Sequence, residues 1–150
     1  MSALFSGLTR SELMSRIRSR GNKNTELALI CVFRENGITG WRRHQPVFGK
    51  PDFVFPKLCL AVFSDGCFWH SCPIHAAKPA KNRAFWRKKL EANKARDQLV
   101  CRTLRKAGWR VLRIWEHELR PKNRTRCMKR LRRFIDRGHA AVTVSTLKAK

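Results

Sequence analysis

Hydrophobic and polar positions follow one another along the chain with two different periods. Four segments repeat apolar residues every three to four positions, as helices do: 10–19, 25–35, 82–106 and 124–134. Four shorter segments are predicted to be strands: 52–55, 58–63 and 109–115, which are rich in apolar residues, and the short segment 41–44. The middle of the second helix, residues 27–33, is apolar on every side, so this helix is predicted to be buried. At 150 residues, this pattern predicts a single α/β domain.

The second and third predicted strands form a hairpin, since only Pro56 and Lys57 lie between them. In an antiparallel pair, the start of one strand lies beside the end of the next. Asp52 opens the first hairpin strand, and Ser64 and Asp65 close the second. These three polar side chains are therefore predicted to converge.

Two later segments have one-sided patterns. Four residues of the long helix share one of its faces: Trp86, Leu90, Asn93 and Asp97. In the strand that follows, alternate residues face opposite sides of the sheet. One side carries Trp109, Val111, Arg113 and Trp115, and the other carries Arg110, Leu112 and Ile114.

The chain is strongly basic, with 34 lysines and arginines, 10 acidic residues and a formal net charge of +24. Charge of this size indicates a polyanionic partner, of which nucleic acid is the simplest. No apolar run approaches the roughly 20 residues of a membrane-spanning helix, and the first residues lack a secretory signal pattern. The six cysteines are expected to be reduced, and the four that stand alone in apolar or helical surroundings are expected to be buried. We therefore expect a cytoplasmic protein.

Cysteines and histidines gather in the loop that follows the hairpin. Cys67, Cys72 and His75 are separated by gaps of four and two residues, and one more ligand would complete a tetrahedral zinc site. Candidates for that ligand are His44, His70, His117 and His139. His117 is favoured because it follows a strand that could run beside the second hairpin strand. Two thiolates and two imidazoles would make a closed, structural site; the alternative is two buried thiols beside surface histidines.

A hydrolytic set is predicted in the same region. Asp52 and Ser64 offer oxygen ligands to Mg²⁺, which would stabilise charge on a phosphate. His70 has a pKa suited to accepting a proton from water, and Asp97 could hold its other ring nitrogen. Taken singly, Asp52 could be a turn residue and Asp97 a partner for surplus arginine. Glu26, in the first turn of a buried helix, is either a partner of the helix dipole or a metal or water contact.

The aromatic residues Phe68, Trp69 and Trp86 also allow two interpretations. Tryptophan is usually buried, so a place in the core is the simplest assignment. In a chain this basic, aromatic rings beside a phosphate-cutting site could instead stack on bases or insert between them.

Several motifs together resemble the very short patch repair (Vsr) endonucleases, over about residues 9–119. They are Pro51-Asp52-Phe53, Asp65-Gly66-Cys67-Phe68-Trp69-His70, Phe85-Trp86 with Asn93 and Arg96-Asp97, and Gly108-Trp109-Arg110-Val111-Leu112 with Trp115-Glu116. The resemblance implies a restriction-endonuclease-like fold of the PD-(D/E)XK superfamily, with a central mixed β-sheet flanked by helices and a structural zinc loop. It also implies Mg²⁺-dependent nicking of DNA 5′ to the thymine of a T:G mismatch, the product of 5-methylcytosine deamination.

The resemblance also implies catalytic roles. Asp52 and Ser64 would bind Mg²⁺, with serine in place of the family's usual threonine. His70 would be the catalytic histidine and Asp97 its acidic partner. Outer members of the metal–water network would be Glu26 and Asp65. The glutamate and lysine of the wider PD-(D/E)XK pattern are missing after Asp52, as they are in Vsr enzymes.

The DNA contacts implied by the resemblance are aromatic and apolar. Phe68, Trp69 and Trp86 would insert beside the mismatch, and Met14 would enter the minor groove. One departure concerns zinc, since the best-known members have a cysteine where His117 stands and order the loop ligands differently. The ligand set Cys67, Cys72, His75 and His117 is therefore an inference from spacing.

The expected organisation is a flexible segment 1–8, an endonuclease domain 9–136 and a basic carboxyl-terminal tail 137–150. The expected partner is double-stranded DNA with a T:G mismatch, bound by a monomer in the cytoplasm at the bacterial nucleoid, with mismatch-repair proteins as further candidates. One alternative is a nicking nuclease of a DNA defence system without T:G specificity. Another is a non-catalytic, zinc-stabilised DNA-binding module, which would leave Asp52, His70 and Asp97 unexplained.

Overall fold

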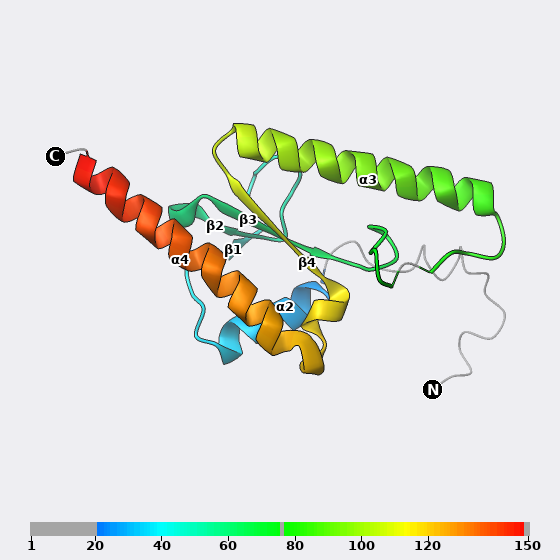
Figure 1. Cartoon of the computed structure of the whole chain (residues 1–150), viewed down its shortest axis with the longest axis horizontal. Coiled ribbons are helices and arrows are strands. Elements are labelled where there is room, and N and C mark those ends of the chain that lie inside the picture. The colour runs from blue at the N-terminus through cyan, green and yellow to red at the C-terminus, as the bar shows by residue number, and fades with distance from the viewer. Residues whose placement is uncertain (1–20, 76, 149–150) are drawn as a thin grey trace.

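The computed structural model describes residues 21–75 and 77–148, which form one β-sheet and the helices around it (Figure 1). The elements, with η marking 3-10 helices, are α2 (Glu26–Glu35), β1 (Arg42–Arg43), β2 (Phe53–Phe55), η2 (Pro56–Leu58), β3 (Leu60–Asp65), α3 (Arg83–Lys106), β4 (Arg110–Trp115), η3 (Glu116–Leu119), η4 (Pro121–Asn123) and α4 (Arg124–Lys148). The predicted α/β class is confirmed. The predicted helix at 10–19, with Met14, lies outside the described residues.

The strands form one mixed sheet in the order β1-β2-β3-β4. β2 and β3 pair antiparallel, with Phe53 opposite Val62, which confirms the predicted hairpin. β4 pairs parallel to β3, with Asp65 opposite Trp115 at their ends. Because the pair is parallel, the loops that follow β3 and β4 leave the sheet at the same edge.

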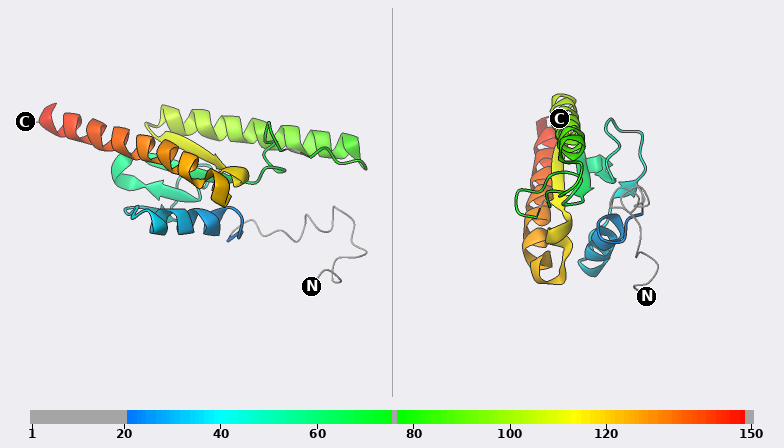
Figure 2. Two further views of the ribbon diagram at one scale, coloured as in Figure 1. Left: turned by 60° about the horizontal axis from the view of Figure 1, so that its bottom comes forward. Right: turned by 90° about the vertical axis from the view of Figure 1, so that its right-hand side faces the viewer.

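Helices cover both faces of the sheet (Figure 2). On one face, buried residues of α2 and α4 such as Phe33 and Leu131 pack against Leu112 and Ile114 of β4. On the other face, α3 packs on Ala61, Phe63 and Val111 through Val100 and Leu104. The alternation predicted for β4 is therefore confirmed, and α3 is held over the sheet by its carboxyl-terminal half.

The predicted burial of the helix at 25–35 is only half right. Leu29, Val32 and Phe33 are completely buried, but Leu27 is 42% exposed and Cys31 is also exposed. This helix lies at the periphery of the fold and packs with one side only, so apolar residues on its outer side meet solvent. Cys59 is likewise exposed, although burial was expected for the isolated cysteines.

The last helix is longer than predicted. α4 continues past the expected end at residue 134 to Lys148. Gly138, a residue that commonly interrupts helices, is accommodated because the helix packs closely there: a Cβ at this position would overlap the guanidinium of Arg110 and lie 3.2 Å from Leu58 Cβ. Within the described part of the chain, no helix combines the length and apolar character needed to cross a bilayer.

The packing of α3 predicts the effect of one glycine substitution. Gly49 has φ of +76° and a Cβ there would overlap the side chain of Val100 on α3. Gly49→Ala is expected to lower the free energy of unfolding by about 3 kcal/mol, from backbone strain and overpacking together. Chemical denaturation would measure the change.

Gly108→Ala is the matched control, because Gly108 also has positive φ, +86°, but a Cβ there would have nothing within 4 Å. We expect it to cost only about 1 kcal/mol. Equal losses in both variants would contradict the assigned contact between Gly49 and α3.

Candidate active site and Cys/His cluster

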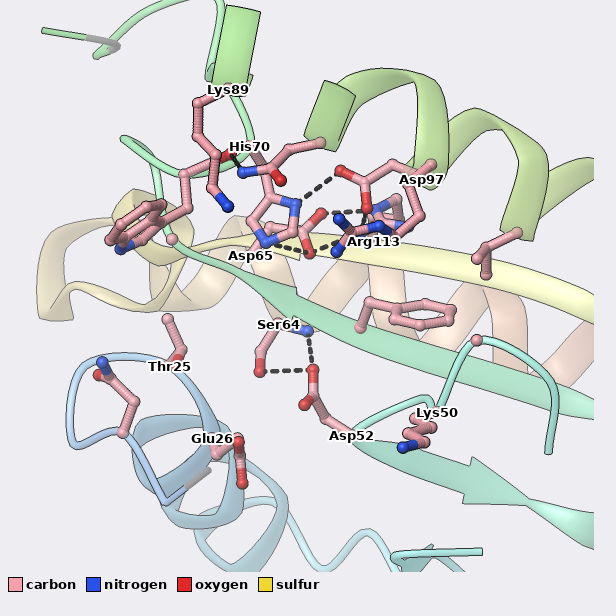
Figure 3. Close-up of a pocket in the computed structure, with 18 residues that line it drawn as sticks. Thr25, Glu26, Lys50, Asp52, Ser64, Asp65, His70, Lys89, Asp97 and Arg113 are labelled. Carbon is pink, nitrogen blue, oxygen red and sulfur yellow. Dashed lines mark hydrogen bonds and ion pairs between the residues drawn. The ribbon is translucent and has the colours of Figure 1, made fainter. Parts of the chain in front are cut away.

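A cleft of about 500 Å³ opens between the start of α2, the start of β2, the end of β3, and α3 (Figure 3). All six residues predicted to form the hydrolytic site line this cleft: Glu26, Asp52, Ser64, Asp65, His70 and Asp97. They come from five separate parts of the chain, so folding brings residues that are distant in sequence into one cleft.

Asp52 and Ser64 meet across the β2–β3 hairpin, as predicted. The Ser64 backbone N–H and hydroxyl both donate to Asp52 Oδ2, at 2.7 and 3.0 Å. Burial raises the pKa of Asp52 above its ordinary value; the Ser64 hydrogen bonds oppose this, and the nearby charges of Glu26 and Asp65 add to it. Among the described residues, Asp52 has no basic side chain within ion-pair distance.

His70 and Asp97 form a short hydrogen-bonded pair. The His70 Nδ1 lies 2.6 Å from Asp97 Oδ2, as drawn in Figure 3. Burial alone would lower the pKa of His70, but the hydrogen bond to Asp97 and the charges of Asp65 and Asp97 outweigh it and raise that pKa above 6.5. Asn93, on the same face of α3, donates to the Trp69 carbonyl at 3.1 Å and ties the loop to the helix.

Arg113 of β4 is a site residue that the sequence did not single out. Its Nε and Nη2 donate to the two carboxylate oxygens of Asp65, at 2.5 and 2.9 Å. Its Nη2 also lies 3.0 Å from Asp97 Oδ1. The available signal was a charged residue on the strand face that also carries Val111, where a core residue would be expected.

Glu26 lies at the far side of the cleft from α3. Only 4% of the residue is exposed, and it accepts from Arg43 Nη2 at 2.5 Å and from the Gly21 N–H at 3.1 Å. It occupies the first turn of α2, where a negative charge is favoured by the helix dipole. Both interpretations given for Glu26 therefore fit its position.

The four predicted zinc ligands lie together. The ligand atoms of Cys67, Cys72, His75 and His117 are all within 4.8 Å of one another. His117 enters from η3, directly after β4, which runs beside β3 as predicted. Burial, followed by the charge of His75, lowers the pKa of His117, which favours the neutral imidazole that a metal requires. The group is a possible metal-binding cluster.

The three predicted DNA-contacting aromatics also lie together. The ring of Phe68 is 5.3 Å from that of Trp69 and 5.4 Å from that of Trp86, both in edge-to-face geometry. Trp86 is only 6% exposed, whereas its neighbour Phe85 is 59% exposed. The structure therefore adds Phe85 as an accessible ring beside the predicted group.

Comparisons with known proteins point to one family of endonucleases. A family model described as DNA mismatch endonuclease Vsr matches residues 2–75. Type II nicking enzyme V.NmeDIP of Neisseria meningitidis serogroup C is 38% identical over 128 residues, covering 84% of this chain and 85% of the relative. The DNA mismatch endonuclease Vsr of Escherichia coli (strain K12) is 34% identical over 113 residues, or 75% and 72% of the two chains.

The chain belongs to the Vsr endonuclease family. This confirms the family resemblance and makes the protein a DNA endonuclease of the nicking type. Type II nicking enzyme V.NaeI of Lentzea aerocolonigenes is 55% identical over 69 residues, which is 46% of this chain and 42% of that relative. The Vsr relationship thus extends to enzymes named for mismatch cleavage and to enzymes named for nicking.

Replacing Asp97 by asparagine is expected to lower the pKa of His70 in this Vsr-family enzyme. The Asp97 carboxylate stabilises the protonated imidazole, so without it the proton leaves at a lower pH. NMR titration of the His70 ring in the absence of divalent metal would measure the change. Glu91→Gln is the matched control, since Glu91 is an exposed acid on the same helix.

The same pair makes stability depend on pH. Because the pKa of His70 is raised by folding, the stabilisation is complete below about 6.5, the ordinary histidine value, and is lost as the pH rises through the higher folded-state pKa. Asp97→Asn should weaken this dependence, because only the charge of Asp65 then still favours the protonated imidazole. An unchanged His70 titration in Asp97→Asn would contradict the assigned pair.

Proposed function

We propose that this Vsr-family endonuclease uses Mg²⁺ to nick one strand of duplex DNA, 5′ to the thymine of a T:G mismatch. The observation that supports it is the meeting of two pairs in one cleft, His70 with Asp97 and Asp52 with Ser64. A histidine held by a carboxylate is suited to deprotonate water, and a carboxylate in the same cleft that has no basic partner among the described residues is suited to hold a cation. A binding module would need neither pair.

Asp52 fits a divalent cation better than the other acids of the cleft. Glu26 is paired with Arg43, and Asp65 with Arg113, whereas Asp52 lacks a basic partner among the described residues and is repelled by both acids. A cation bound by Asp52, with an oxygen of Ser64 as second ligand, would relieve this repulsion. Mg²⁺ there would stabilise negative charge on the phosphate under attack.

His70 would act as the general base. Asp97 accepts a hydrogen bond from Nδ1, which leaves the proton-free nitrogen of neutral His70 at Nε2. This atom would take a proton from water as the water attacks phosphorus. Asp97 would then stabilise the imidazolium that forms, as its own lowered pKa indicates. Ser64 and the hairpin would keep Asp52 in place throughout.

Preference for a mismatch would come from the aromatic residues beside the cleft. Trp69 lines the cleft and contacts Phe68 and Trp86. Inserting such rings between bases costs a few kcal/mol of unstacking, and the cost is least where pairing is already weak. A T:G pair is such a step, so the same rings would favour it over a matched pair.

We further propose that the Cys/His cluster binds a structural Zn²⁺. Zinc bonds of about 2.3 Å to sulfur and about 2.0 Å to nitrogen place tetrahedral ligand atoms about 3.3–3.8 Å apart. The Nδ1 of His117 lies 3.4 Å from Cys67 Sγ and 3.5 Å from Cys72 Sγ, and His75 Nδ1 lies 3.9 Å from Cys72 Sγ. Zinc would fix the loop that carries His70. We also propose that the enzyme acts on duplex DNA as a monomer.

A nicking assay tests the proposed activity. A labelled duplex with one T:G pair, beside matched T:A and C:G duplexes, is expected to be cut only 5′ to the mismatched thymine and only with Mg²⁺. His70→Ala and Asp52→Ala should each slow cutting about 100-fold or more, because they remove the base and the cation ligand. Asp136→Ala, an exposed acid on α4 outside the cleft, should cut normally.

Other outcomes would separate the alternatives. Equal cutting of all three duplexes would reject T:G specificity and favour the nicking enzyme of a DNA defence system. Tight, salt-sensitive binding without any cutting would reject the proposed nuclease activity and favour the binding module.

Metal analysis tests the zinc proposal. The purified protein is expected to contain about one zinc per chain, and Cys72→Ser should lose both the metal and thermal stability. Cys127→Ser is the matched control, because Cys127 is as deeply buried (2% against 1% exposed) but lies outside the cluster. Equal zinc contents in the two variants, or none in the wild type, would contradict the proposal.

A further inference from the structure

Arg113 makes an unusually complete set of contacts for a residue in the middle of a strand. Its guanidinium binds both oxygens of Asp65 and one oxygen of Asp97. It also lies 4.6 Å above the centre of the Phe63 ring, and its Nη1 is 3.7 Å from Cys101 Sγ. These contacts fix the plane of the guanidinium, and with it the positions of two carboxylates that flank His70.

The two carboxylates compete for one imidazole. Asp97 binds His70 Nδ1 at 2.6 Å, while Asp65 Oδ1 lies 3.8 Å from the opposite nitrogen, Nε2. Asp65 is only 2% exposed, so its charge is screened little by solvent and requires a partner within the protein. Apart from Arg113, the basic group within ion-pair distance of Asp65 among the described residues is His70, whose Nε2 lies about 1 Å beyond hydrogen-bonding distance. Without Arg113, we expect Asp65 to close this gap.

We propose that Arg113 is a positioning residue that holds Asp65 off His70 Nε2 and thereby keeps this nitrogen free for the attacking water. The inference rests on the proposed role of His70 as general base. Arg113 satisfies both Asp65 oxygens, and by binding Asp97 Oδ1 it leaves Oδ2 directed at Nδ1. The Arg113 guanidinium therefore determines which carboxylate binds His70 and which ring nitrogen that carboxylate binds.

Arginine is suited to this task and lysine is not. The guanidinium presents its donors in a planar fork that matches a carboxylate at two points, and a further donor reaches a second acid. A lysine ammonium is a single point charge, which could neutralise Asp65 but could not fix its orientation. The planar guanidinium packs over the Phe63 ring and contacts Cys101 Sγ, and these contacts hold it in place.

The test is the rate of a single turnover on the duplex that the wild type nicks, measured with saturating enzyme. Arg113→Leu is expected to reduce this rate about 100-fold, as displacement of a reacting group by about 1 Å can do. DNA affinity measured without divalent metal should stay within about threefold, because Arg113 acts through His70 rather than on DNA. The single-turnover rate of Arg113→Lys should lie between those of the wild type and Arg113→Leu, about tenfold below the wild type.

A second substitution separates positioning from stability. Adding Asp65→Asn to Arg113→Leu removes the unpaired carboxylate, so the double variant should recover the melting temperature and nick within about tenfold of the rate of Asp65→Asn alone. Recovery of the melting temperature with a loss of about 100-fold still present relative to Asp65→Asn would overturn the proposal. So would a normal rate in Arg113→Leu.

Arg110→Leu is the matched control. Arg110 is a partly buried arginine on the same strand that faces the other side of the sheet and donates to the carbonyls of Phe134 and Leu58. We expect it to lower the melting temperature but leave the turnover rate unchanged. His70→Ala is measured alongside: if it nicks normally, the proposed role of His70 fails, whereas an inactive His70→Ala with a fully active Arg113→Leu rejects only the inference about Arg113.

Discussion

Parallel pairing between β3 and β4 is the constraint on which the rest of the molecule depends. The register places Ser64 beside Ile114 and Asp65 beside Trp115, so both strands end at one edge. The loop after β3 supplies His70 and two cysteines, and the turn after β4 supplies His117. The cleft and the Cys/His cluster are therefore built from the same two strand ends, and a shift in register would disrupt both.

Charge is the second constraint. Four of the ten acidic residues line one cleft of a protein that carries a net charge of +24. A polyanion would be repelled by that group if it were not neutralised. Arg43 and Arg113 neutralise Glu26 and Asp65, and Asp97 lies against both His70 and Arg113. The remaining acid, Asp52, has no basic partner among the described residues, and it is there that we propose a cation binds.

Sequence reasoning located much of this site because its signals are local. The Pro56-Lys57 connection fixes the hairpin and hence the meeting of Asp52 with Ser64, and helical spacing places Asp97 on the inner face of α3. Arg113 was missed because alternation along a strand gives the face of a side chain but not its partner, which comes from another strand. The exposed side of α2 and the extension of α4 past Gly138 depend on neighbouring elements, which a periodic pattern does not contain.

The long last helix α4 ends far from the cleft. The carboxyl-terminal part of α4 extends away from the sheet, at the opposite end of the molecule from the loop that follows β3 (Figure 1). A fluorophore, affinity handle or second protein attached at that end would stand clear of the cleft. The enzyme can therefore be tethered to a surface, or followed on single DNA molecules, with the cleft directed away from the point of attachment.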